Sequence, residues 1–196
     1  MRRTAPLHQT RSVSDGPPSD LVGRTFAERY KVLAPLGAGG MGAVYEAEHL
    51  TLGRRVALKV LQPEVAGLAE FRQRFEREAR ALSGLNHPNI VTVTDFGIHE
   101  GVPFLVMELI DGLTLKELLS GERLLRARVV ELARQLFRGV AHAHAAGLVH
   151  RDLKPQNVIV QRRDDASDHV FVLDFGLARA IEGDATVTQS GLVVGT

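Results

Sequence analysis

Short runs of alternating apolar and polar residues dominate the first half of the chain, and this alternation predicts strands. Between two of these runs, Phe75, Ala79 and Leu82 recur at helical spacing. Past residue 112, longer stretches with helical spacing dominate instead, which indicates an α+β chain. The predicted strands are 30–36, 43–49, 55–61, 91–96, 104–107, 158–160 and 170–173, and the predicted helices are 71–85, 114–119 and 126–146.

Finer expectations concern the second half of the chain. Thr114 and Glu117 form a capping-box arrangement at the start of the helix 114–119, Gly147 ends the helix 126–146, and 161–169 is predicted to be a solvated loop. The apolar residues predicted on one face of the helix 126–146 are Val129, Leu132, Ala133, Leu136, Phe137, Val140 and Ala141.

A glycine-rich segment, residues 37–42, separates the first two predicted strands. Its G-x-G-x-x-G frame also occurs in dinucleotide-binding folds, where a helix follows it. Here a strand-like run follows, beginning near Val44, so the segment is better interpreted as a hairpin that folds over phosphates. Because glycine-rich hairpin turns are common, this frame alone is weak support for nucleotide binding.

Two carboxylates, a carboxamide and an ammonium group lie beside the last two predicted strands. Asn157 and Asp174 can offer oxygen ligands to a hard divalent cation such as Mg²⁺. Asp152 is then free to orient and deprotonate a hydroxyl group, and Lys154 can neutralise phosphate charge. Asn157 or Asp174 alone would be read as a turn residue. Together the four side chains predict phosphoryl transfer.

Composition narrows the range of partners. The chain has 196 residues, of which 44% are hydrophobic, and a net charge of +1. It therefore has no excess of basic residues that would point to nucleic acid or an anionic membrane as a partner. No apolar run approaches the length of a membrane span. The absence of cysteine excludes disulfide and thiolate chemistry. We expect this chain in the cytoplasm, with membrane anchoring of a longer protein left open.

Residues 150–157 read H-R-D-L-K-P-Q-N and residues 174–176 read D-F-G, which match the protein-kinase patterns H-R-D-L-x-x-x-N and D-F-G. Residues 56–59 read V-A-L-K, close to the V-A-I-K of the same family. The chain therefore resembles the eukaryotic-type (Hanks-type) protein kinases, and Lys154 is typical of their serine/threonine subgroup. The resemblance covers about residues 26–196. It implies an N-lobe and hinge at 26–110 and a partial helical C-lobe at 111–196. Residues 1–25 show no sustained periodicity and contain Pro17 and Pro18, so their composition predicts a disordered arm.

The resemblance implies the catalytic roles. Asp152 would be the base, Lys154 would steady the transferring phosphate, and Lys59 would contact the nucleotide phosphates. His150 would be a packing and backbone-bonding residue, not a base. The expected partner of Lys59 is a glutamate on the helix at 71–85. We choose Glu78 over Glu70 and Glu76, because Glu78 lies three residues after Phe75 and four before Leu82, on or beside the buried stripe.

The resemblance also implies bound Mg-ATP. Backbone groups of Glu108 and Ile110 would pair with adenine, Met107 would lie at the back of the pocket, and Asn157 and Asp174 would hold metal. The other expected nucleotide contacts are Leu36, Gly37, Ala38, Gly39, Gly40, Gly42, Val44, Ala57 and Lys59.

Residues after Gly176 resemble an activation segment. In the family, an arginine at the position of Arg151 receives a phosphate from this segment, and phosphorylation of a loop hydroxyl can order the loop. The candidate hydroxyls are Thr186, Thr188 and Ser190. Self-association of two copies would allow one to phosphorylate the other.

The sequence stops at Thr196, before the A-P-E motif and the helices that follow it in the family. We therefore expect weak or no activity from these residues alone. The leading hypothesis is an ATP-dependent kinase acting on Ser and Thr hydroxyls of proteins, and the alternative is a non-catalytic nucleotide-binding scaffold. Small-molecule kinases of related fold also stay open, although Pro155 after Lys154 favours protein substrates.

Overall fold

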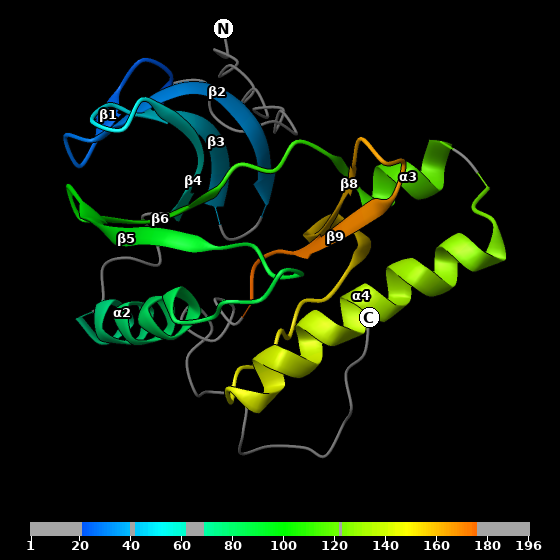
Figure 1. Ribbon diagram of the computed structural model, residues 1–196. Coiled ribbons are helices and arrows are strands. Elements are labelled where there is room, and N and C mark those ends of the chain that lie inside the picture. Colours follow the sequence, from blue (N-terminus) through cyan, green and yellow to red (C-terminus); the bar gives the residue numbers. More distant parts are fainter. Residues whose placement is uncertain (1–20, 40–41, 62–68, 122, 176–196) are drawn as a thin grey trace, which may run out of the picture.

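A six-stranded antiparallel sheet forms the first part of the molecule (Figure 1). The computed structural model describes residues 21–39, 42–61, 69–121 and 123–175. Helix α2 (Ala69–Ser83) packs beside β5 and completes what we call the sheet unit. The strands run in the order β1-β2-β3-β4-β6-β5 and are β1 (Thr25–Phe26), β2 (Tyr30–Gly39), β3 (Gly42–His49), β4 (Arg54–Leu61), β5 (Val93–His99) and β6 (Val102–Glu108).

Alternation along β4 gives this sheet two different faces. Val56, Leu58 and Val60 join one apolar cluster, whereas Ala57 and Leu61 join a second cluster that includes Phe75 of α2. Because successive side chains on a strand point to opposite faces, Lys59 lies on the face with Ala57 and Leu61. The buried lysine is thus directed toward α2 and the second cluster.

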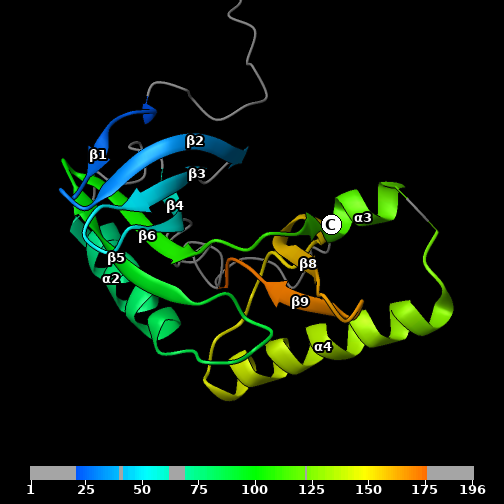
Figure 2. The same ribbon diagram turned by 45° about the horizontal axis from the view of Figure 1, so that its top comes forward.

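A smaller sheet and two helices form the hairpin unit. Its strands are β7 (Leu113–Thr114), β8 (Val158–Arg162) and β9 (Asp168–Val172), in that order, and its helices are α3 (Leu115–Gly121) and α4 (Arg126–Ala145). Figures 1 and 2 show α4 running along the β8–β9 hairpin. Helix α3 contacts β7 and β8. A 3-10 turn, Pro155–Asn157, leads directly into β8.

Most predicted elements are present with shifted ends. The Thr114–Glu117 capping box is confirmed: Thr114 Oγ1 accepts from the Glu117 N–H, and Glu117 Oε2 accepts from the Thr114 N–H. Gly147, at φ 78°, lies just past α4 as expected. Strands β1 and β7 were not predicted, because two-residue strands carry no detectable alternation.

Two expectations need correction. The segment 161–169 was predicted to be a solvated loop; residues 163–167 are exposed, but β8 continues to Arg162 and β9 begins at Asp168, whose side chain is 6% exposed. Helix α4 was predicted to bury a stripe containing Phe137, which is 64% exposed. Its buried positions are Leu132, Gln135, Gly139 and Ala143.

Gly139 explains this rotation of the buried face. A Cβ atom there would lie 2.8 Å from the backbone oxygen of Asn89, so α4 approaches the segment after α2 closely only along the small side of the helix.

No helix among the described residues is long and apolar enough to cross a membrane.

Candidate active site

Three predicted site residues gather on the turn before β8. Lys154 Nζ lies 2.7 Å from Asp152 Oδ2. Asn157 Nδ2 donates to the backbone oxygen of Asp152 at 2.8 Å and to its Oδ2 at 3.2 Å. The Asn157 N–H donates to the Lys154 carbonyl, which closes the turn. A carboxylate, an ammonium group and an amide therefore share one short segment.

The β8–β9 hairpin brings Asn157 and Asp174 to the same end of the small sheet. Val158 pairs with Val172, so the residue before β8 and the residues after β9 are neighbours. The Leu173 N–H donates to the Asn157 carbonyl at 2.9 Å. The antiparallel register of β8 and β9 thus brings the two predicted metal ligands close together.

Asp174 also meets the sheet unit. Its Oδ1 lies 2.7 Å from Lys59 Nζ on β4, and the two side chains are 25% and 7% exposed. Asp174 adopts φ 57°, a left-handed conformation that is uncommon outside glycine. The predicted phosphate-contacting lysine and the predicted metal ligand are therefore in direct contact.

His150 anchors the catalytic segment to the chain before Asp174. Its Nε2 lies 2.7 Å from the Leu173 carbonyl, and its ring is 4.7 Å from the Phe175 ring. Burial lowers the pKa of His150 below its ordinary 6.5, although the Leu173 carbonyl opposes this shift. His150 is therefore a packing and backbone-bonding residue, as predicted, and is not placed to act as a base.

The glycine segment closes a tight hairpin above Lys59. Gly39 pairs with Gly42, and Val44 pairs with Lys59. Gly42 has φ 145°, and a Cβ there would lie 2.1 Å from the Val60 carbonyl oxygen, so this position requires glycine. Gly37, Ala38 and Gly39 form the end of β2, and Gly40 lies outside the described residues.

Four residues predicted to line the nucleotide pocket belong to one apolar cluster. Ala57 and Met107 are buried in it, and Val44 and Ile110 pack against it. Leu36, another predicted nucleotide contact, is 51% exposed. Glu108 ends β6, where its N–H donates to the Thr92 carbonyl and its Oε1 accepts from the Thr92 N–H.

Glu78 is a buried glutamate of α2. It is 8% exposed beside buried Phe75 and Ala79, whereas Glu76 is exposed. Helical periodicity thus selects the more buried of these two glutamates, and the side chain of Glu70, the third candidate, lies outside the described part of the chain. Its pairing with Lys59 stays a prediction.

The donor set at the hairpin end fits Mg²⁺. A carboxylate and an amide oxygen are hard ligands, and Mg²⁺ is usually held by one or two such side chains together with phosphates and water. Among the described residues no group of three His, Cys, Asp or Glu side chains could hold a metal ion by itself.

Electrostatics keeps the predicted base ionised. The Lys154 ammonium, which donates a hydrogen bond to Asp152, lowers the pKa of that carboxyl below its ordinary 3.8, against a smaller opposing effect of burial. Asp152 is thus a carboxylate at neutral pH.

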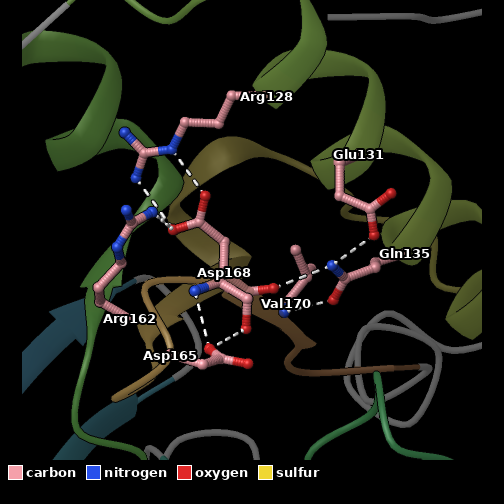
Figure 3. Close-up of polar contacts among 8 residues, drawn as sticks. Arg128, Glu131, Gln135, Arg162, Asp165, Asp168 and Val170 are labelled. Carbon is pink, nitrogen blue, oxygen red and sulfur yellow. Dashed lines mark hydrogen bonds and ion pairs between the residues drawn. The ribbon is translucent and has the colours of Figure 1, made fainter.

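A second polar cluster, which the sequence reasoning missed, lies behind β9 (Figure 3). Asp168 pairs with both Arg128 and Arg162, and Gln135 bonds to the backbone of the same strand. Arg128 lowers the pKa of Asp168. The sequence did contain one sign of this cluster: Gln135 lies between Leu132 and Leu136, where a polar residue interrupts an apolar stripe.

The geometry defines the class first: a glycine hairpin and a buried lysine on an antiparallel sheet face a hairpin that carries Asp152, Asn157 and Asp174, as in protein kinases. The protein kinase domain family matches residues 30–196, and the chain belongs to this family. The resemblance found in the motifs is thereby confirmed. The predicted phosphorylation sites Thr186, Thr188 and Ser190 lie outside the described residues.

Individual relatives agree with the family. The chain is 44% identical over 170 residues to serine/threonine-protein kinase pkn2 of Myxococcus xanthus, covering 86% of this chain and 20% of pkn2. The crystal structure of the Mycobacterium tuberculosis PknI kinase domain matches with a TM-score of 0.69 and 34% identity, over 79% of this chain and 62% of that one.

A structure of Rad53 residues 1–466 in complex with AMP-PNP is also similar. It matches with a TM-score of 0.67 and 27% identity, over 76% of this chain and 38% of the Rad53 chain. The predicted α+β, kinase-like fold is therefore confirmed, and the chain spans only part of the proteins it matches.

Proposed function

We propose that the chain transfers the γ-phosphoryl group of Mg-ATP to Ser and Thr hydroxyls of protein substrates. The ion pair between Lys59 and Asp174 carries this proposal, because it joins the sheet that would hold the nucleotide to the hairpin that would hold the metal. Family membership and the AMP-PNP complex of the similar Rad53 structure support an adenine nucleotide.

Each side chain then has one task. The Asp152 carboxylate orients the substrate hydroxyl and accepts its proton as the oxygen attacks the γ-phosphorus, while the bond to the β-phosphate oxygen breaks. Lys154 exchanges its contact with Asp152 for the transferring phosphate. Asn157 and Asp174 would hold Mg²⁺, which when bound neutralises phosphate charge.

Lys59 would bind the nucleotide phosphates from the sheet side, with Glu78 orienting it. Because the Glu108 N–H already donates to Thr92, we assign adenine to the Glu108 carbonyl and the Ile110 amide. Positioning and charge stabilisation would supply most of the rate.

Changing Asp152 to Asn tests the proposal. We expect peptide phosphorylation to fall about 10²- to 10⁴-fold while Mg-dependent nucleotide binding persists. The assay uses the 196 residues and a chain extended toward the length of the matched kinase domains, because we expect weak transfer from the short chain. Binding without transfer in the extended chain would favour the non-catalytic scaffold instead.

Two finer predictions belong to this function. Phosphorylation of Thr186, Thr188 or Ser190 by a second copy would order the segment through Arg151, which is exposed and at φ 65°. Mass spectrometry of the protein after incubation with ATP would locate the phosphate. A cytoplasmic location of this chain also stays a prediction.

A further inference from the structure

Gln135 is a buried amide on α4 to which the proposed function gives no role. It is 8% exposed. Its Oε1 accepts from the Val170 N–H at 3.0 Å and from Asn89 Nδ2 at 3.2 Å. Its Nε2 donates to the Asp168 carbonyl and to Glu131 Oε1, each at 3.0 Å (Figure 3). The oxygen and the nitrogen of the amide thus each make two hydrogen bonds, and each has one partner in the backbone of β9.

These contacts make the outer edge of β9. Strand β8 pairs with one edge of β9. On the other edge, the Val170 N–H donates to Gln135, and the Val170 carbonyl accepts from Asn89 Nδ2 at 2.9 Å. Two side chains therefore replace a neighbouring strand at this residue, and they satisfy buried backbone groups that would otherwise lack partners.

At Val172, two residues further along β9, the partners on the outer edge are backbone groups instead of side chains. The Val172 N–H donates to the Asn89 carbonyl and the Val91 N–H donates to the Val172 carbonyl, each at 3.0 Å. This parallel pairing continues the edge that Gln135 begins. Asp174 follows two residues later, already in contact with Lys59.

The arrangement links three elements to the position of one carboxylate. Asn89 belongs to the segment after α2, Gln135 belongs to α4, and both hold β9 just before Asp174. A one-residue change in strand register inverts every side chain, so the edge contacts decide where Asp174 emerges. Gly139 admits the close approach that lets Asn89 and Gln135 meet.

We propose that Gln135 and Asn89 are positioning residues for Asp174, fixing the outer edge of β9 so that the carboxylate meets Lys59 and the metal. The metal part of this inference rests on the proposed function. An amide is needed at residue 135, because its oxygen accepts two hydrogen bonds while its nitrogen donates two. A glutamate there would face Glu131 and the Asp168 carbonyl with negative charge.

The test is the Mg²⁺ dependence of nucleotide binding by the 196-residue chain, measured with a fluorescent ATP analogue. We expect Gln135→Met to raise the apparent Mg²⁺ dissociation constant about 10- to 100-fold, as for other residues that orient metal ligands. Affinity for the nucleotide without metal should change little. Asn89→Ala leaves the backbone pairing at Val172 in place and should also raise the apparent Mg²⁺ dissociation constant. It provides the test if Gln135→Met does not fold.

Val32→Ala is the matched control. Val32 is 1% exposed in the cluster on the opposite face of the large sheet, so this change destabilises the fold away from β9. It should lower the melting temperature without changing the Mg²⁺ constant. Equal Mg²⁺ constants for the wild type and the folded Gln135 or Asn89 variants, or an equal increase in Val32→Ala, would overturn the inference. A wild type with no Mg-dependent nucleotide binding would instead overturn the proposed function, and the metal part of the inference with it.

Discussion

Lys59 and Asp174 are separated by 115 positions in the chain, yet their charged atoms lie 2.7 Å apart. One comes from the middle of the large sheet and the other from the end of the small hairpin. This pair is a polar connection between the two units at the candidate site, and its lysine is buried. In the proposed reaction the same two groups separate to receive a phosphate and a cation.

Removing the lysine charge should affect both stability and transfer. We expect Lys59→Met to lower phosphorylation at least about 100-fold, as loss of a preorganised charge contact typically does. Breaking a fully buried ion pair costs roughly 3–5 kcal/mol, and the partial exposure of Asp174 should make this loss smaller. Urea unfolding measures it.

A double-mutant cycle with Asp174→Asn separates the pair from other effects. With Lys59 already changed to Met, the second change should cost less than it does in the wild type. Additive losses in the two single variants and the double variant would show that the contact contributes nothing to stability.

Two glycines of the hairpin over Lys59 should respond differently to alanine. Gly42→Ala places a methyl group against the Val60 carbonyl at φ 145°, whereas a Cβ at Gly37 meets no atom within 4 Å. A backbone strained in this way costs about 1–3 kcal/mol, and the clash adds to it. We expect thermal unfolding and nucleotide affinity to change in Gly42→Ala. Gly37→Ala is the control, and equal effects of both changes would contradict the interpretation.

The sequence predicted the site better than the surroundings that hold it. Asp152, Lys154, Asn157 and Asp174 are found by fixed spacing within two short motifs, and local spacing survives folding. Glu78 could be chosen because burial on a helix follows a 3.6-residue period. These signals are local, so one sequence suffices to read them.

Contacts between distant segments could not be read in this way. Asn89 and Gln135 are 46 positions apart, and nothing in either neighbourhood indicates that the two amides meet. Asp168 looked like a loop residue because it follows a polar run, yet Arg128 on another element buries it. The buried face of α4 was misjudged for the same reason: apolar count favoured Phe137, whereas close approach to Asn89 selected Gly139.

Helix α4 should therefore tolerate change on its apolar outer face. Phe137 is 64% exposed and Leu132 is 6% exposed. We expect Phe137→Ser to change the free energy of unfolding by less than about 0.5 kcal/mol, and Leu132→Ala to cost about 2–5 kcal/mol. Chemical denaturation of both variants of the 196-residue chain makes the comparison. A large loss in Phe137→Ser would mean that this face is covered in solution.

His150 should make stability fall on mild acidification. Its pKa is lowered by burial in the folded protein, so as pH drops below the ordinary value of 6.5 the unfolded chain takes up the proton first. The stability that depends on neutral His150 is therefore complete above about pH 6.5 and is lost as the pH falls through the folded-state pKa. Protonation would add a charge at Nδ1, which is buried and has no hydrogen-bond partner among the described residues.

Unfolding free energies at several pH values between about 7.5 and 5.5 test this expectation in the wild type and in His150→Gln. The variant should be less stable at neutral pH, because it loses the ring contact with Phe175, but its stability should fall less steeply with acid. His144→Gln, at an exposed position near the end of α4, is the matched control and should keep the wild-type slope. Parallel pH curves for the wild type and His150→Gln would mean that His150 does not titrate differently in the folded and unfolded chain, and the slope would then have to come from other groups.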